Sequence, residues 1–364
     1  MKKLPPDYAE LLQPALEEMA PYEPEKGKAG LCLDANESPY APSRAMRAKV
    51  AALAREIDLN RYPDPMMGDL SALIRKHYRV RRDARVVFGN GSDEIIGILC
   101  AVFAGGSRKR ARLLVPTPSF SMYGQIARGL GYDVVGVPLD ENFDLDVDDW
   151  AKVLVRKPAN VIFLATPNNP TGNCYDPDAV SWLVRNSGAI VVVDEAYGDY
   201  GEISFADRAG KEPNLVVLKT LSKVGFASLR LGMALTSEAI AEQMEKVRLP
   251  YNISTFSQRV AELYFREPAE TKKQTETLVR ERKGLAEKMR TLENVEVFRS
   301  DANFLLFRTP KAPQLHKKLL AEGIRIRNLS RPGPLENCLR VTIGTPANNR
   351  AFWNALRKNL EGGA

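Results

Sequence analysis

The chain has 364 residues, of which 52 are Lys or Arg and 45 are Asp or Glu, so its formal net charge is +7. With 44% hydrophobic and 27% charged residues, its composition is that of an ordinary globular protein, which argues against a disordered, collagen-like or disulfide-scaffold chain. At about 150 residues per domain, this length predicts two domains, or one large and one small.

The first residues and the apolar runs do not predict a membrane protein. The start MKKLPPDYAE has two lysines but no apolar stretch behind them, so we do not expect a signal peptide. The longest apolar runs, such as 161–165, are far shorter than the about 20 residues that a spanning helix needs. The four cysteines lie far apart without a CxxC pair, which favours reduced thiols in a cytoplasmic protein.

The basic residues are scattered along the chain and form only short clusters, at 79–82 and 108–110. No zinc-finger, RNP or basic-zipper pattern accompanies them, so we expect no nucleic-acid partner. A positive surface also suits an anionic substrate, because positive potential steers anions.

In chain order, residues 1–29 are expected to form an N-terminal arm. Between about residues 85 and 235 a short apolar run, a polar or glycine-rich turn and a helical stretch recur. Most runs are β-branched and do not alternate with polar residues, which is typical of strands buried on both faces. Strands that alternate with helices predict an α/β layered sheet. The predicted strands are 85–88, 112–115, 134–137, 161–165, 190–193, 215–218 and 231–234.

The pattern changes after residue 267, which predicts a second, smaller α+β domain. A charged helical stretch at 270–291 leads into it, and the segment 30–50 is expected to pack with it. The chain is thus divided into an arm (1–29), a small domain (30–50 and 268–364) and a large domain (51–267). The small domain's predicted elements are strands at 303–308, 324–327 and 339–343 and helices at 313–322 and from 348.

Polar loops follow five of the predicted strands, and ligands of open α/β sheets bind beyond the carboxyl ends of the strands. The loops are 89–94, 116–123, 166–172, 194–197 and 219–223. The chain's two histidines lie outside them, so neither a histidine-based triad nor a histidine-rich metal site is expected.

The turn at 89–91 could begin a dinucleotide-binding fingerprint. However, Glu94 stands at the third glycine position, and no strand-ending acid follows at about twenty residues, which disfavours a pyrophosphate. A strand, turn and helix of this kind still offer free N–H groups and a positive dipole end to one phosphate.

With histidine chemistry and a pyrophosphate site disfavoured, four features of the loops remain. They are a possible phosphate cradle, Asp194 at a strand end, Tyr197 one turn later, and Lys223 after a Thr-x-Ser sequence. Pyridoxal 5′-phosphate requires this set, because it needs a lysine for a Schiff base and an acid beside its pyridine nitrogen.

The stretches 168–172, 194–197 and 222–223 resemble those of fold-type I pyridoxal-phosphate aminotransferases. Further motifs, DANESP at 34–39, NRYP at 60–63, PYN at 250–252 and LRVTIGT at 339–345, resemble those of the histidinol-phosphate aminotransferases, in order from about residue 22 to 350. The resemblance implies a large domain with a mostly parallel seven-stranded sheet between helices. It also implies transfer of nitrogen from L-glutamate to imidazole acetol phosphate in histidine biosynthesis.

The resemblance further implies cofactor roles. Lys223 bonds to the cofactor and then shuttles the substrate proton, Asp194 pairs with the pyridine nitrogen, and Tyr123 stacks on the ring. Tyr197 and Asn169 form hydrogen bonds with the ring oxygen of the cofactor. The backbone around Ser92, Asp93 and Glu94, together with Thr220, Ser222 and Arg230, holds the phosphate.

For the substrate, the resemblance implies that Arg340 binds the carboxylate of glutamate. Arg327 binds the substrate phosphate or the second carboxylate, and guanidinium forks suit both anions. Asn169 also faces the substrate, Tyr22 closes over it, and Tyr62 reaches the neighbouring subunit's site, which implies a homodimer.

Alone, each motif is compatible with a turn, a helix cap, a surface side chain or core packing. Three other functions remain open: an aromatic amino-acid aminotransferase, a threonine-phosphate decarboxylase, and a cofactor-sensing protein without turnover. The interval from Lys223 to Arg230 is seven residues, one shorter than is commonest in the family, and Arg350 is left out of the site.

Overall fold

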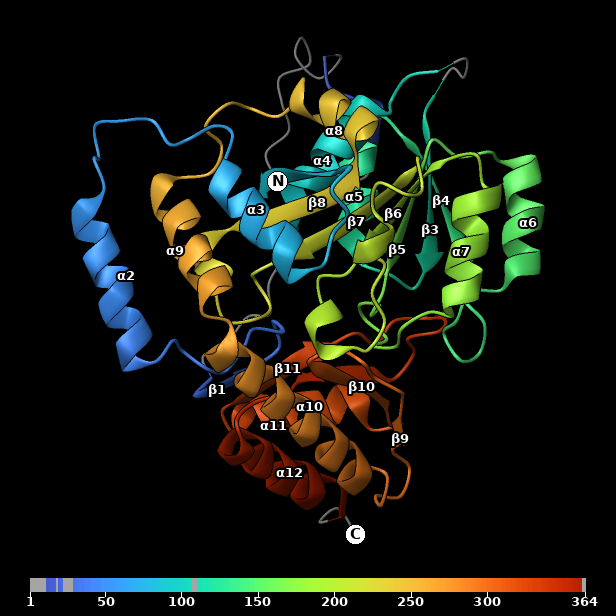
Figure 1. Ribbon diagram of the computed structural model, residues 1–364. Coiled ribbons are helices and arrows are strands. Elements are labelled where there is room, and N and C mark those ends of the chain that lie inside the picture. Colours follow the sequence, from blue (N-terminus) through green and yellow to red (C-terminus); the bar gives the residue numbers. More distant parts are fainter. Residues whose placement is uncertain (1–10, 18, 22–28, 107–109, 362–364) are drawn as a thin grey trace.

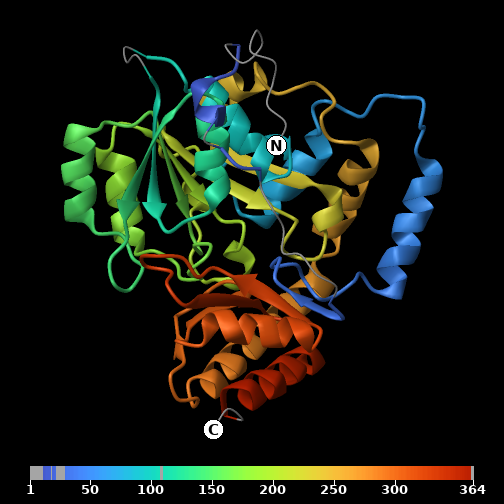
Figure 2. The same cartoon turned by 180° about the vertical axis from the view of Figure 1, so that it is seen from behind.

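The computed structural model describes residues 11–17, 19–21, 29–106 and 110–361. Its larger part contains a sheet with helices on both sides, and a smaller part lies below it with a second sheet backed by helices (Figure 1). The view from behind shows the same two tiers (Figure 2).

The larger sheet has seven strands in the order β2-β8-β7-β6-β5-β3-β4. Only β8 runs against its neighbours, pairing antiparallel with both β2 and β7. This confirms the predicted mostly parallel seven-stranded sheet. Its strands are β2 (Ala84–Asn90), β3 (Arg112–Thr117), β4 (Asp133–Pro138), β5 (Val161–Ala165), β6 (Ile190–Asp194), β7 (Leu215–Thr220) and β8 (Leu231–Ser237).

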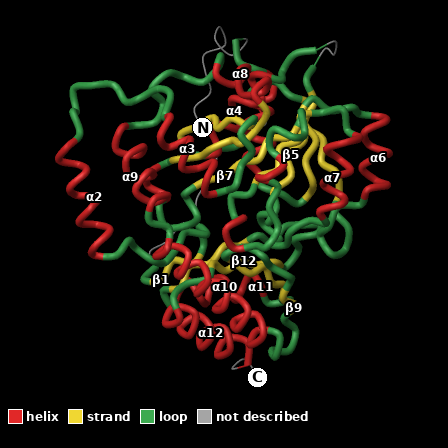
Figure 3. Tube along the Cα trace, in the orientation of Figure 1, coloured by secondary structure: helices red, strands yellow, loops and turns green. Residues whose placement is uncertain are grey.

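Both faces of this sheet are buried, which explains why its strands are apolar without alternation. Along β5, Ile162 and Leu164 belong to one hydrophobic core, while Val161 and Phe163 belong to the core on the other face. Figure 3 shows the strands in yellow between red helices. The helices α4 (Ser92–Val102), α5 (Ser121–Gly129) and α8 (Glu238–Glu245) cover one face, and α3 (Gly68–His77), α6 (Val147–Arg156) and α7 (Pro177–Asn186) the other.

The second sheet has five strands in the order β1-β11-β12-β10-β9. The first strand of the chain pairs in parallel with β11, so segments far apart in sequence share one sheet. The strands are β1 (Leu31–Leu33), β9 (Glu296–Val297), β10 (Phe304–Arg308), β11 (Ile324–Asn328) and β12 (Cys338–Thr342), and they pack against α10 (Ala269–Met289), α11 (Ala312–Ala321) and α12 (Pro346–Glu361).

The remaining elements are α2 (Arg44–Glu56), α9 (Thr255–Arg266) and the 3₁₀ turns η1 (Pro14–Glu17), η2 (Gly198–Tyr200), η3 (Ala206–Arg208) and η4 (Ala227–Leu229). The two-residue β9 and three-residue β1 were not predicted. The domain boundaries after residues 29, 50 and 267 stay predictions. Among the helices of the described ranges, none is both long and apolar enough to span a membrane.

Candidate active site

A cavity of about 460 Å³ lies where the carboxyl ends of the parallel strands face the second sheet. Two elements of the smaller part contribute to it, the loop after β1 and the segment from β11 to β12. The cavity brings together most of the predicted site residues: Ser92, Asp93, Tyr123, Asn169, Asp194, Tyr197, Thr220, Ser222, Lys223, Arg230, Arg327 and Arg340.

Asp194 ends β6 and is 4% exposed. Because strand residues alternate between faces, its side chain lies on the α5 side of the sheet, as does that of Val192. The Tyr123 hydroxyl donates to one carboxylate oxygen at 2.6 Å, and the Ala196 N–H donates to the other at 2.9 Å. Burial raises the pKa of Asp194 from 3.8 to about 6, although both hydrogen bonds oppose the shift.

Tyr123 is 1% exposed, and its ring stacks on Phe163 with centroids 4.7 Å apart. One face of the Tyr123 ring thus packs in the core, and the Tyr123 hydroxyl is hydrogen-bonded to Asp194. Phe120, which the sequence analysis did not select, also lines the cavity and meets Tyr123 edge-on at 5.3 Å. The stacking of Tyr123 on a cofactor ring stays a prediction, and Phe120 is a second aromatic group at the same place.

The beginning of α4 and the beginning of β8 form a tight cradle. Gly91 is the N-cap of α4, adopts φ +77° and has no capping side chain, so the first N–H groups of the helix have no side-chain acceptor from that position. A Cβ on Gly91 would lie 2.5 Å from the Arg230 guanidinium, and one on Gly232 would lie 2.4 Å from the Ser92 nitrogen. Because these glycines have no Cβ, the backbone around Ser92 and the Arg230 guanidinium can lie close together, and the N–H groups and the guanidinium border the same small space.

The other groups of the cradle are hydroxyls and one ion pair. The Thr220 hydroxyl is 2.9 Å from the Ser222 hydroxyl, and it accepts the Ser222 N–H at 3.2 Å. Arg230 contacts the Asp93 carboxylate at 3.2 Å, with both side chains about half exposed. Helix N–H groups, hydroxyls and a guanidinium are together suited to bind a phosphate.

Lys223 follows β7 by three residues, and its ammonium nitrogen lies 5.6 Å from the centre of the Tyr197 ring. The Tyr197 hydroxyl accepts a hydrogen bond of 3.0 Å from the Asn36 amide. Asn36 is 1% exposed and also exchanges hydrogen bonds with Thr342. Asn36 is a site residue that the sequence analysis quoted within the motif at 34–39 without giving it a role.

Arg340 is 8% exposed and lies beside Asn169 across the cavity. One guanidinium nitrogen donates to the Asn169 side-chain oxygen at 2.5 Å, and another donates to the Asp34 carbonyl at 2.8 Å. The guanidinium carbon is also 5.1 Å from the centre of the Phe304 ring. These contacts hold the guanidinium in a fixed orientation, as recognition of a carboxylate requires.

Two predicted residues of the described ranges, Glu94 and Tyr62, do not line the cavity. The Glu94 carboxylate turns away and accepts hydrogen bonds from the Asn90 N–H and the Asn252 amide. Tyr62 is 81% exposed and stacks on Tyr251 at 4.5 Å. Tyr22 lies outside the described residues.

A buried ion pair joins the strands that carry the site. Lys219 and Glu195 approach to 2.5 Å, with side chains 4% and 0% exposed, on the sheet face opposite Thr220 and Asp194. The Glu195 carboxylate also accepts from the Ser204 hydroxyl at 2.7 Å. Burial alone would lower the pKa of Lys219, but the neighbouring carboxylates outweigh it and raise that pKa.

The arrangement fits the predicted cofactor. The cradle accepts one phosphate, since added Cβ atoms would fill the space beside its N–H groups. Asp194 is a buried carboxylate whose pKa is raised by burial, and a protonated pyridine nitrogen beside it would stabilise its charged form. Lys223 and Tyr197 line the same cavity.

Comparisons with known proteins find relatives over nearly the whole chain. The sequence model of the family described as aminotransferase class I and II matches residues 28–356. Histidinol-phosphate aminotransferase 2 of Nitrosococcus oceani is 37% identical over 352 residues, which are 96% of this chain and 97% of the relative. The histidinol-phosphate aminotransferase of Aquifex aeolicus is 36% identical, over 95% of this chain and 97% of the relative.

A solved structure shows the same fold. It is the histidinol-phosphate aminotransferase of Sinorhizobium meliloti in complex with pyridoxal-5′-phosphate, with a TM-score of 0.84 and 20% identity over 97% of this chain and 98% of that chain. The match of the family to nearly the whole sequence, together with the identity to full-length relatives, shows that the chain belongs to the aminotransferase class I and II family.

Proposed function

We propose that the chain transfers an amino group between histidinol phosphate and L-glutamate, with imidazole acetol phosphate and 2-oxoglutarate as the keto forms, in histidine biosynthesis. Its cofactor is pyridoxal 5′-phosphate. The observation that carries the proposal is a single cavity in which the cofactor-binding groups of the large sheet face arginines of the second sheet. Relatives that are named for this activity match nearly the full chain, which supports the choice of substrate.

The chemistry that pyridoxal 5′-phosphate supplies when bound is an electron sink, which makes the Cα–H bond of an amino substrate easier to break. The buried Asp194 carboxylate holds a proton on the ring nitrogen, and Tyr123 and Ala196 fix its orientation. The Nζ atom of Lys223 removes the proton from the substrate Cα. Tyr197, held by Asn36, orients the ring oxygen.

Arginines on the second sheet support an anionic substrate. Arg327 of β11, Arg331 of the loop that follows β11 and Arg340 of β12 all line the cavity. Guanidinium groups bind both carboxylates and phosphates in bidentate geometry, so one set of arginines serves two different substrates.

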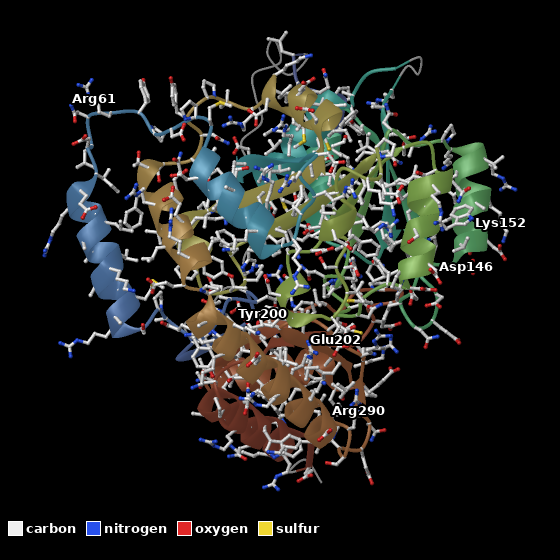
Figure 4. The ribbon with its side chains drawn as sticks, viewed as in Figure 1. Arg61, Asp146, Lys152, Tyr200, Glu202 and Arg290 are labelled. Carbon is white, nitrogen blue, oxygen red and sulfur yellow. The ribbon has the colours of Figure 1, made fainter. Side chains whose placement is uncertain are left out.

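The proposal includes a homodimer. Large apolar side chains are exposed together around the loop that carries Tyr62, and patches of this kind mark association surfaces. In Figure 4 the loop's Arg61 lies at the outer edge of the molecule, above α2. A second copy covers this surface, and Tyr62 completes the partner's cavity. The exposed side chains are Leu59 (92%), Tyr62 (81%), Met66 (77%), Leu249 (68%) and Tyr251 (42%).

Sedimentation at micromolar concentration tests the dimer, and a monomer under those conditions would contradict it. We also propose that the protein acts in the cytoplasm, which the widely spaced, unpaired cysteines support.

Amine-donor profiling of the purified holoenzyme tests the function. Steady-state rates are measured with histidinol phosphate, phenylalanine and tyrosine as donors, and carbon dioxide release is measured with O-phosphothreonine. We expect the highest kcat/KM with histidinol phosphate. Preference for the free aromatic amino acids would identify an aromatic aminotransferase, and carbon dioxide release would identify a decarboxylase.

A further inference from the structure

Tyr200 connects the loop of the predicted cofactor lysine to the smaller part of the protein. It ends the short turn η2 and is 4% exposed. Its ring belongs to the hydrophobic core that also contains Leu278 of α10 and Leu305 of β10. Figure 4 labels Tyr200 where the large part of the molecule meets α10.

The Tyr200 hydroxyl donates a hydrogen bond of 2.6 Å to the main-chain carbonyl of Lys223. Nearby, the Asn303 amide donates to the Asn36 carbonyl at 3.0 Å. Asn36 donates in turn to the Tyr197 hydroxyl. Two sets of buried hydrogen bonds therefore join the two parts of the protein: Tyr200 holds Lys223, and Asn303 and Asn36 hold Tyr197.

The main chain of Tyr200 is anchored as well. Arg282 of α10 is 5% exposed, and one guanidinium nitrogen donates to the carbonyls of Ala302 at 2.6 Å and Tyr200 at 3.4 Å. The ring and the main chain of Tyr200 are thus fixed by the smaller part, while its hydroxyl holds the loop that follows β7.

We propose that Tyr200 is a positioning residue for Lys223. Fixing the Lys223 carbonyl sets the direction of its Cα–Cβ bond, so that only the side chain moves during the reaction. Since Nζ stands at the end of a long side chain, a small rotation of the peptide unit would displace it much further, and misplacement of a reacting group lowers the rate. The inference rests on the role of Lys223 in the proposed function.

The test uses Tyr200→Phe, which keeps the buried ring and removes only the hydroxyl. A hydrogen bond of this kind is worth about 0.5–1.5 kcal/mol, so we expect kcat to fall by about 3- to 10-fold with KM nearly unchanged. Two readouts are independent of turnover. We expect slower appearance of the lysine-bound chromophore when pyridoxal 5′-phosphate is added to the cofactor-free protein, and a shifted pH titration of its absorbance.

Tyr132→Phe is the matched control. Tyr132 is also 4% exposed, and its hydroxyl donates at 2.7 Å to the Cys100 carbonyl, outside the cavity. The Tyr132→Phe variant should lose about as much stability as Tyr200→Phe, while its kcat and both chromophore readouts stay as in the wild type. Arg282→Met removes the hydrogen bond to the Tyr200 carbonyl, and it should move the readouts in the same direction even where Tyr200→Phe does not fold.

The positioning role would be overturned if the folded variants form the chromophore at the wild-type rate, show the wild-type pH titration of its absorbance and keep the wild-type kcat. Borohydride reduction of the wild-type holoenzyme, followed by peptide mapping, tests the underlying assignment separately. A label on Lys223 keeps the proposed function in place, whereas a label elsewhere would remove both the assignment and the inference.

Discussion

Arg327 on β11 and Arg340 on β12 lie directly opposite each other in antiparallel register, and both line the cavity. Side chains at opposed positions are about 4.5–5.5 Å apart at Cβ, and like charges there disfavour the sheet. In the proposed function, both guanidinium groups bind anionic groups of the substrate.

Arg327→Ala should raise KM for histidinol phosphate by about 10- to 100-fold, because hydrogen bonds to charged groups are worth about 1.5–3 kcal/mol. Steady-state kinetics check this. Arg350→Ala, on the exposed side of α12, is the control and should keep wild-type constants. An unchanged KM in Arg327→Ala would mean that the guanidinium does not contact the substrate.

Lys223→Ala should abolish transamination while the fold and the cradle for the cofactor phosphate persist. Single-turnover reaction with glutamate measures the first property, and circular dichroism and equilibrium dialysis of pyridoxal 5′-phosphate measure the other two. Lys246→Ala, an exposed change in the loop after α8, serves as the control. Wild-type turnover without the Lys223 amine is the result that excludes its assigned role.

Asp194→Asn should stabilise the cofactor-free protein at neutral pH. The pKa of Asp194 is raised from 3.8 to about 6, so the folded state binds more protons than the unfolded state between these values. The free energy of unfolding therefore falls as the pH rises through this window and stays lower above it. The Asp194→Asn variant does not undergo this fall in the free energy of unfolding, which amounts to at most about 3 kcal/mol.

Urea unfolding of both cofactor-free proteins at about pH 4 and about pH 7.5 gives the comparison. The gain of the Asp194→Asn variant should be present only at the higher pH, and its affinity for pyridoxal 5′-phosphate should be weaker. If the two proteins differ by the same free energy of unfolding at both pH values, the pKa of Asp194 is not raised in the folded state.

Gly232→Ala should disrupt the phosphate cradle, because the new Cβ would lie 2.4 Å from the Ser92 nitrogen and 2.5 Å from the Gly91 carbonyl carbon. We expect lower stability and lower affinity for the cofactor, measured by thermal unfolding and equilibrium dialysis. Gly97→Ala in α4 is the matched control, since its nearest neighbour would be 3.9 Å away and alanine favours a helix. Normal cofactor affinity in Gly232→Ala would argue against this cradle.

Lys219→Met should destabilise the protein by about 3–5 kcal/mol, because it leaves the Glu195 carboxylate buried without its cation. The double change Lys219→Met with Glu195→Gln should recover a large part of that loss, since the unpaired charge is removed. Urea unfolding of the wild type, both single variants and the double variant gives the coupling energy. Additive losses would show that the two groups do not interact.

Much of the large sheet could be predicted from the sequence because its chemistry is local. A strand such as Val161–Ala165, buried on both faces, leaves an unbroken apolar run, and Asp194 follows such a run directly. The end of a parallel strand is also where ligands bind, so position along the chain already indicated the place of the acid.

Contacts across the fold could not be predicted in the same way. Asn36 and Tyr200 act through partners far away in the sequence, and no local spacing records those pairings. Phe120 is the N-cap of α5 and Tyr123 lies in its first turn, and the packing of Tyr123 on Phe163 and its hydrogen bond to Asp194 distinguish their surroundings. Tyr62 carries a prediction about a second subunit, which a single chain does not contain.

The pairing of β1 with β11 brings Leu31 beside Ile324, near opposite ends of the chain. During synthesis, the large sheet can form while the ribosome is still adding residues, but the wall that carries Arg327 and Arg340 cannot. The two halves of the pocket are therefore completed at different times. A nascent or truncated polypeptide that ends before β11 has Lys223 and Asp194 but lacks both arginines.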